Sequence, residues 1–143
     1  MQTVRPLPAI IAITLALTAL PYAQGAQTFK TRLSPMPVDA TNQAATTGVG
    51  AVTAVLTGTK VSISGTFSGL QGPATIAQVH VGAKGISGPP VLDLTVTKAT
   101  SGTLQGELML TSAQVEHLKR GRLYVQIHSE KAPEGNLRGW LLP

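Results

Sequence analysis

Two histidines are the residues of this chain best suited to hold a metal ion. His80 lies in the segment 76–81 and His128 in the segment 123–129, and in both segments apolar residues alternate with polar ones. Such alternation is typical of a half-buried strand, and it puts both imidazoles, together with Gln78, on the face turned away from the core. Imidazole nitrogen suits copper and zinc, whereas amide oxygen is a poor ligand for either. His80, His128 and Gln78 are therefore candidate copper or zinc ligands; the alternative, which we favour, is that the histidines are surface or hydrogen-bonding residues.

Tyr124, Gln126, Arg138 and Trp140 form a second candidate site. A turn rich in proline and glycine separates the segment 123–129 from a returning apolar run, which predicts a β-hairpin. A symmetric turn pairs Tyr124 with Trp140 and Gln126 with Arg138 on the outward face. The four side chains can be a binding patch for a protein or a sugar, or a cross-strand ladder that only supports the fold.

The sequence gives little indication of a catalytic site or of a cysteine-based site. The acidic residues of the C-terminal half stand singly, and no G-x-S-x-G motif occurs. Cysteine is absent, which excludes thiolate metal sites and disulfides. We therefore expect a protein that is not an enzyme and that carries no cofactor, with copper or zinc as the alternative.

Positive charge does not indicate a nucleic-acid partner. The chain has 11 Lys and Arg residues against 6 Asp and Glu residues, and these cations are scattered. The cluster Lys119, Arg120 and Arg122 falls at the end of a predicted helix, where cations complement the helix dipole, and no aromatic residues alternate with it. The charge favours encounter with acidic surfaces or polysaccharides without identifying one.

The first residues resemble a secretory signal peptide. A basic start at 1–5 precedes an apolar run at 8–20 and the small residues Ala23 and Gly25. The run is shorter than the roughly 18 residues of a spanning helix. We expect cleavage after Gly25, a mature domain of residues 26–143 without a membrane span, and export to the periplasm or the extracellular space.

Period-two alternation between turn signals recurs along residues 26–143 and predicts an all-β protein. Gly58-Thr59 is a hairpin turn between two amphipathic segments. One segment differs: Thr111 and Gln114 match a capping box, and Gly121 suits the position after a helix, so a short helix is expected over 112–120. The predicted fold is an antiparallel Greek-key β-sandwich, immunoglobulin-like or Cu/Zn superoxide dismutase-like, with one short helix.

Four segments resemble motifs of the CHRD domain, the repeat of chordin that also occurs alone in exported bacterial proteins. The segment 118–129 is similar to L-x-x-G-x-L-Y-V-x-I-H-T, and 133–139 to P-x-G-E-I-R-G. The segment 77–82 is similar to A-H-I-H-x-G, with Gln78 where the family often has its first histidine. The opening L-S-G-x-x-E-V-P-P resembles 33–38, without its glutamate. The similarity spans roughly 28–142.

The resemblance implies an exported, non-catalytic binding or structural module. Its partner would be an extracytoplasmic protein or polysaccharide. The alternative is a copper- or zinc-binding protein, because the placement of His80 and His128 is similar to the copper side of Cu/Zn superoxide dismutase.

Overall fold

Strands dominate the computed structural model, which describes residues 25–143; the predicted signal peptide lies, except for Gly25, outside this range. The elements are β1 (Gln27–Pro35), β2 (Val49–Thr57), β3 (Lys60–Ser68), β4 (Ala74–Val81), β5 (Pro90–Val96), β6 (Gly102–Met109), α1 (Ser112–Lys119), β7 (Leu123–Ser129) and β8 (Leu137–Trp140). The prediction of an all-β protein with one short helix is confirmed.

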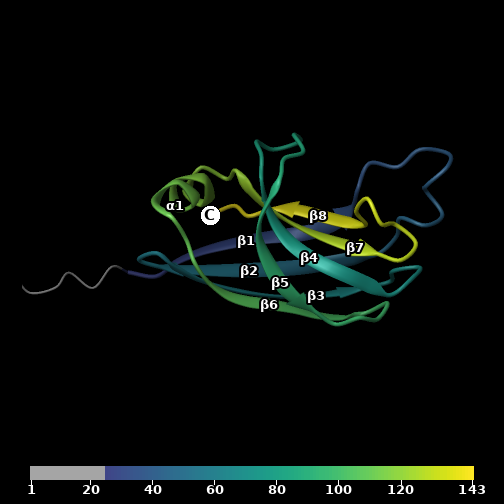
Figure 1. Ribbon diagram of the computed structural model, residues 1–143, viewed down its shortest axis with the longest axis horizontal. Coiled ribbons are helices and arrows are strands. Elements are labelled where there is room, and N and C mark those ends of the chain that lie inside the picture. The colour runs from purple at the N-terminus through teal and green to yellow at the C-terminus, as the bar shows by residue number, and fades with distance from the viewer. Residues whose placement is uncertain (1–24) are drawn as a thin grey trace, which may run out of the picture.

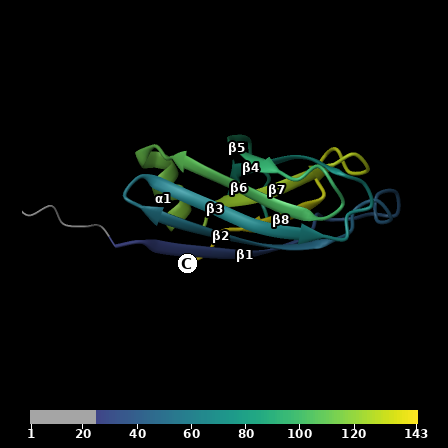
Figure 2. The same ribbon diagram turned by 90° about the horizontal axis from the view of Figure 1, so that it is seen from below.

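The strands pair antiparallel in the order β1-β2-β3-β6-β5-β4-β7-β8, and β8 returns to β1, so the sheet closes into a barrel (Figure 1). β7 lies beside β4 and completes a Greek key with β4, β5 and β6. The predicted two-sheet sandwich is not confirmed, although the barrel is flattened (Figure 2). β1 and β5 close the barrel because each changes partner along its length. β1 pairs first with β2 and then with β8, and β5 pairs first with β4 and then with β6.

Inward-facing apolar residues of the alternating segments fill the barrel. β2 and β3 join through the predicted turn at Gly58, whose φ of 63° suits glycine. In β4, Ala77 and Val79 are buried in the core, as the alternation predicted. The largest core side chains are Phe29, Leu33, Leu56, Ile63, Phe67, Leu70, Leu94, Leu104, Leu110, Leu118, Leu123, Ile127, Leu137 and Leu141. This core fixes which side chains face outward.

The helix α1 begins and ends as its sequence predicts. The Thr111 side chain accepts from the Gln114 amide, and the Gln114 side chain accepts from the Thr111 amide. Gly121 has a φ of 65° just after the helix. Leu118 is the helix residue buried in the core, so α1 covers one end of the barrel. Within residues 25–143 no helix is long and apolar enough to cross a membrane.

Candidate functional site

Polar and aromatic side chains gather on the outward face of β4, β7 and β8. The ladder pairs His80 with Tyr124, Tyr124 with Trp140, and Gln126 with Arg138, so the predicted hairpin register is confirmed. His128 lies on the same face of β7, two residues beyond Gln126. We call these six residues the outer layer: His80, Tyr124, Gln126, His128, Arg138 and Trp140.

The outer layer faces away from the core, as alternation predicted, but it is not an open surface. His80 is 6% exposed, Tyr124 1% and Gln126 4%, while the other three residues are half-buried. The β4–β5 loop, residues 82–89, contacts one end of the layer, and the β7–β8 turn, residues 130–136, contacts the other. Alternation locates the outward face correctly but does not reveal that loops cover it.

Four hydrogen bonds attach the base of the β4–β5 loop to the outer layer. The Gly88 carbonyl accepts from Nδ1 of His80 at 2.8 Å and from the Tyr124 hydroxyl at 3.0 Å. The same hydroxyl accepts from the Gly88 amide at 2.9 Å, and Nε1 of Trp140 donates to the Gly82 carbonyl at 3.0 Å. Both ends of the loop are therefore fixed to the barrel.

Gly88 also shows how tightly the loop base is packed. A Cβ at this position would lie 1.7 Å from the carbonyl oxygen of Val81, so no other residue fits without a backbone shift. The middle of the loop is different, because residues 83–87 are exposed and the Ile86 residue is 61% exposed to solvent. In Figure 1 this loop, between the ends of β4 and β5, projects away from the barrel.

A chain of hydrogen bonds orients the other end of the layer. Arg138 donates through two nitrogens to Oε1 of Gln126, at 3.0 and 2.9 Å. The Gln126 amide nitrogen therefore points the other way and donates to Nε2 of His128, 3.1 Å distant. Nδ1 of His128 carries the proton, because it lies 2.8 Å from the Pro133 carbonyl, which can only accept. Arg138 thus sets the tautomer of His128 through Gln126.

His80 is the residue of the layer whose bonding is incomplete. Its Nδ1 must carry the proton to donate to the Gly88 carbonyl, so Nε2 has a free lone pair. That Nε2 is buried without a hydrogen-bond partner, which native structures rarely tolerate without a reason. Burial lowers the pKa of His80, and the nearby His128 and Arg138 lower it further while the bond to Gly88 opposes them. The imidazole is neutral at neutral pH.

Aromatic stacking completes the layer. The rings of His80 and Tyr124 are stacked with centroids 5.0 Å apart, and His80 and His128 follow at 6.3 Å. The guanidinium of Arg138 lies 4.9 Å from the Tyr124 ring centroid and 5.7 Å from that of Trp140. These are cation–π distances. The four residues of the predicted patch therefore form a cross-strand ladder, a geometry that both interpretations of the patch share.

The predicted metal ligands are only partly brought together. His80 and His128 share the layer, but Nε2 of Gln78 donates to Oδ1 of Asp93 at 2.9 Å, on the side of β4 toward β5. Within the described range 25–143, no group of three or more His, Cys, Asp and Glu side chains is placed to hold a metal ion. Gln78 is thus engaged elsewhere, and the two histidines lack a third ligand of these four types.

Met36, which the sequence analysis did not single out, lies at the edge of the outer layer. A Cβ at Gly135 would lie 2.5 Å from the Met36 sulfur and 2.8 Å from Nε2 of Gln126. Sulfur and amide therefore flank one narrow space beside the β7–β8 turn. The contact joins residues far apart in the chain, and no local pattern indicates it.

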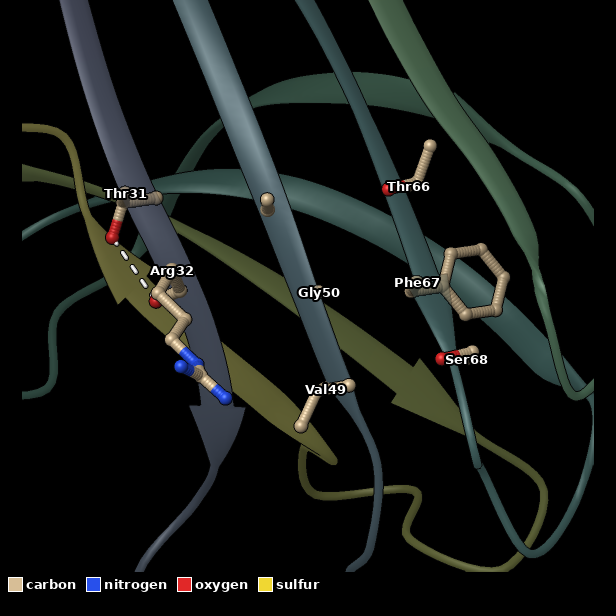
Figure 3. A pocket seen from close by; sticks show the side chains of 8 residues that line it. Thr31, Arg32, Val49, Gly50, Thr66, Phe67 and Ser68 are labelled. Atoms are coloured by element: carbon tan, nitrogen blue, oxygen red, sulfur yellow. Dashed lines mark hydrogen bonds between the residues drawn. The ribbon is translucent and has the colours of Figure 1, made fainter.

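The opposite side of the barrel carries a shallow depression with few reactive groups. It lies over β1, β2 and β3, where Arg32, Val49, Thr66 and Ser68 line it (Figure 3). Hydroxyl and aliphatic side chains and the aromatic Phe67 line it together with this single cation. It offers no clustered bases, acids or ligands, so the chemistry of the described residues is concentrated in the outer layer.

The fold and the outer layer define an all-β barrel module with a loop fixed on a polar, aromatic face. The chain belongs to the CHRD domain family, because the family model of the CHRD domain matches residues 29–141. The sequence-based identification is confirmed, and the matched range includes every residue of the outer layer. No curated protein and no solved structure matches the chain.

Proposed function

We propose that this protein is an exported, non-catalytic binding module of the CHRD type, and that its β4–β5 loop recognises the partner. One observation carries the proposal: the base of the loop is bonded to His80, Tyr124 and Trp140, while its tip exposes Ile86. A loop held in one conformation loses little entropy on binding. The outer layer then acts as the support of a recognition loop.

The tip of the loop suits a protein partner better than a polysaccharide. Ile86 and its exposed neighbours Ala83 and Lys84 present an aliphatic surface beside one cation. An aliphatic side chain gains free energy by entering an apolar pocket, and a cation at the rim steers association with an acidic surface. We therefore place an extracytoplasmic protein with an apolar pocket and acidic rim first, and a polysaccharide second.

Capture of partners from the native cell envelope tests the proposal. The variant Ile86→Asp should lose capture, because a carboxylate cannot enter an apolar pocket without a large desolvation cost. The matched control is Ile76→Asp, an exposed isoleucine of β4 at the end of the strand away from the loop. Equal capture by both variants, with both folded, would contradict the role of the loop.

Export is tested separately by N-terminal sequencing of the protein recovered outside the cytoplasm. The chain should begin at Ala26, because Ala23 and Gly25 fit the small-residue cleavage pattern. Recovery of residues 1–25 on a membrane-bound protein would contradict the proposed processing.

A second candidate function is the binding of copper or zinc. The observation that favours it is the buried Nε2 of His80, which has a lone pair and no partner. This candidate function includes the sequence-based expectation that the two histidines are placed as on the copper side of Cu/Zn superoxide dismutase. A metal bound only by the folded state raises its thermal midpoint in a concentration-dependent way. Absence of that response for both Cu²⁺ and Zn²⁺ would remove divalent metal binding from consideration.

A further inference from the structure

The two histidines of the outer layer are oriented as metal ligands are. Each donates Nδ1–H to a backbone carbonyl, His80 to Gly88 and His128 to Pro133, both at 2.8 Å. Ligating histidines use such a bond at the other ring nitrogen to fix the tautomer and raise the basicity of the ligating nitrogen. In both rings the lone pair is on Nε2: that of His80 has no partner, and that of His128 accepts from the Gln126 amide. The two ring centroids lie 6.3 Å apart.

Gln126 lies against Nε2 of His128 and across a narrow space from the Met36 sulfur. Its Nε2 lies 3.1 Å from Nε2 of His128, and the space that a Cβ at Gly135 would fill separates it from the sulfur. The amide is held there by Arg138 and by a long bond of 3.4 Å to the Glu134 carbonyl. One neutral hydrogen bond from the amide to His128 is what an entering ion must replace.

The donor set selects the kind of ion. Two imidazoles and a thioether are neutral, and the only charged side chain bonded into this network is the cationic Arg138. The set carries no negative charge, so a monovalent ion leaves less uncompensated charge in this buried site than a divalent ion does. A thioether is a soft ligand that selects Cu(I), and imidazole also suits copper.

We propose that His80 Nε2, His128 Nε2 and Met36 Sδ form a binding site for monovalent copper, with Gln126 as the group that occupies it in the metal-free protein. The proposal rests on the second candidate function and is independent of the recognition loop. It replaces Gln78, whose amide is bonded to Asp93, with Met36 as the third ligand. No electron transfer is part of the proposal, because Cu(I) binds and leaves in one oxidation state.

Anaerobic titration of the purified exported protein with Cu(I), in competition with a chromogenic Cu(I) chelator, tests the site. We expect one ion per chain at micromolar affinity or tighter. Met36→Leu should weaken binding by about tenfold or more, because leucine keeps the volume and removes the sulfur. The matched control Met109→Leu changes an exposed methionine of β6 and should leave the affinity unchanged. Gln78→Ala should also leave it unchanged.

A second measurement tests the ligands without any substitution. The X-ray absorption spectrum of the Cu(I)-loaded wild-type protein should show one sulfur and two nitrogen neighbours. Equal affinities of the Met36→Leu and Met109→Leu variants, or a copper shell without sulfur, would overturn the proposal while leaving a histidine-only site open. Absence of stoichiometric Cu(I) would also overturn it; partner capture through Ile86 would stand in either case.

Discussion

Replacement of Tyr124 by phenylalanine isolates the bond network that holds the β4–β5 loop. The ring stays in place between His80 and Trp140, and only the hydroxyl is removed. The hydroxyl makes two bonds to Gly88, donating to its carbonyl and accepting from its amide. The carbonyl keeps its bond from His80, so the amide loses its partner in a half-buried position.

The expected cost of Tyr124→Phe follows from these bonds. Loss of the bond from the hydroxyl to the Gly88 carbonyl costs about 1 kcal/mol. The Gly88 amide, left without a partner, adds roughly 1 kcal/mol more, which gives about 2 kcal/mol in all. For a domain of this size the thermal midpoint should fall by about 6 °C. Chemical denaturation and calorimetry both measure the change.

Thr66→Val is the matched control, because it removes a hydroxyl from an exposed position of β3 and should change stability by no more than about 0.5 kcal/mol. If Tyr124→Phe also changed stability this little, the hydroxyl would not hold the loop base, and the support role of the outer layer would be wrong.

Three further changes probe the core, the loop base and the buried imidazole. Ile127→Asp should destabilise the domain by about 4 kcal/mol or more, because it puts an unpaired charge in the core; retention of cooperative unfolding near the wild-type midpoint would contradict the facing of β7. Gly88→Ala should release the loop, because its Cβ collides with the Val81 carbonyl; partner capture at the wild-type level would contradict this. Burial lowers the pKa of His80 below its usual value of 6.5, so on acidification the unfolded chain takes up the proton before the folded protein does. The contribution of His80 to the free energy of unfolding is therefore complete above about pH 6.5 and is lost as the pH falls through the lowered folded-state pKa. His80→Gln should make the free energy of unfolding, measured in urea, depend less on pH in this range. An unchanged pH dependence would mean that other groups cause it.

The local features of the chain could be predicted from the sequence because neighbouring residues determine them. The capping box of Thr111 and Gln114 specifies the start of α1, and the Gly58 turn specifies the β2–β3 hairpin. The pairing of Tyr124 with Trp140 follows from the symmetry of one turn. The facing of His80 follows from alternation in β4.

The features that were not predicted depend on contacts between distant segments. Closure of the barrel requires β1 to pair with β2 and then with β8, a change of partner that alternation does not encode. The burial of Tyr124 and Gln126 requires loops to cover them, and the packing of Gly88 against Val81 depends on the path of the whole loop. The approach of Met36 to Gly135 likewise appears only in three dimensions.

Amide hydrogen exchange at Gly88 tests the central claim, that the outer layer holds the β4–β5 loop in one conformation, most directly. The Gly88 amide donates to a buried hydroxyl, so it should exchange much more slowly than an unprotected loop amide. In Tyr124→Phe its protection should fall, while the amide of Leu141, bonded to the Leu123 carbonyl at the same end of the barrel, should keep its protection. Free exchange of Gly88 in the wild-type protein would contradict the account.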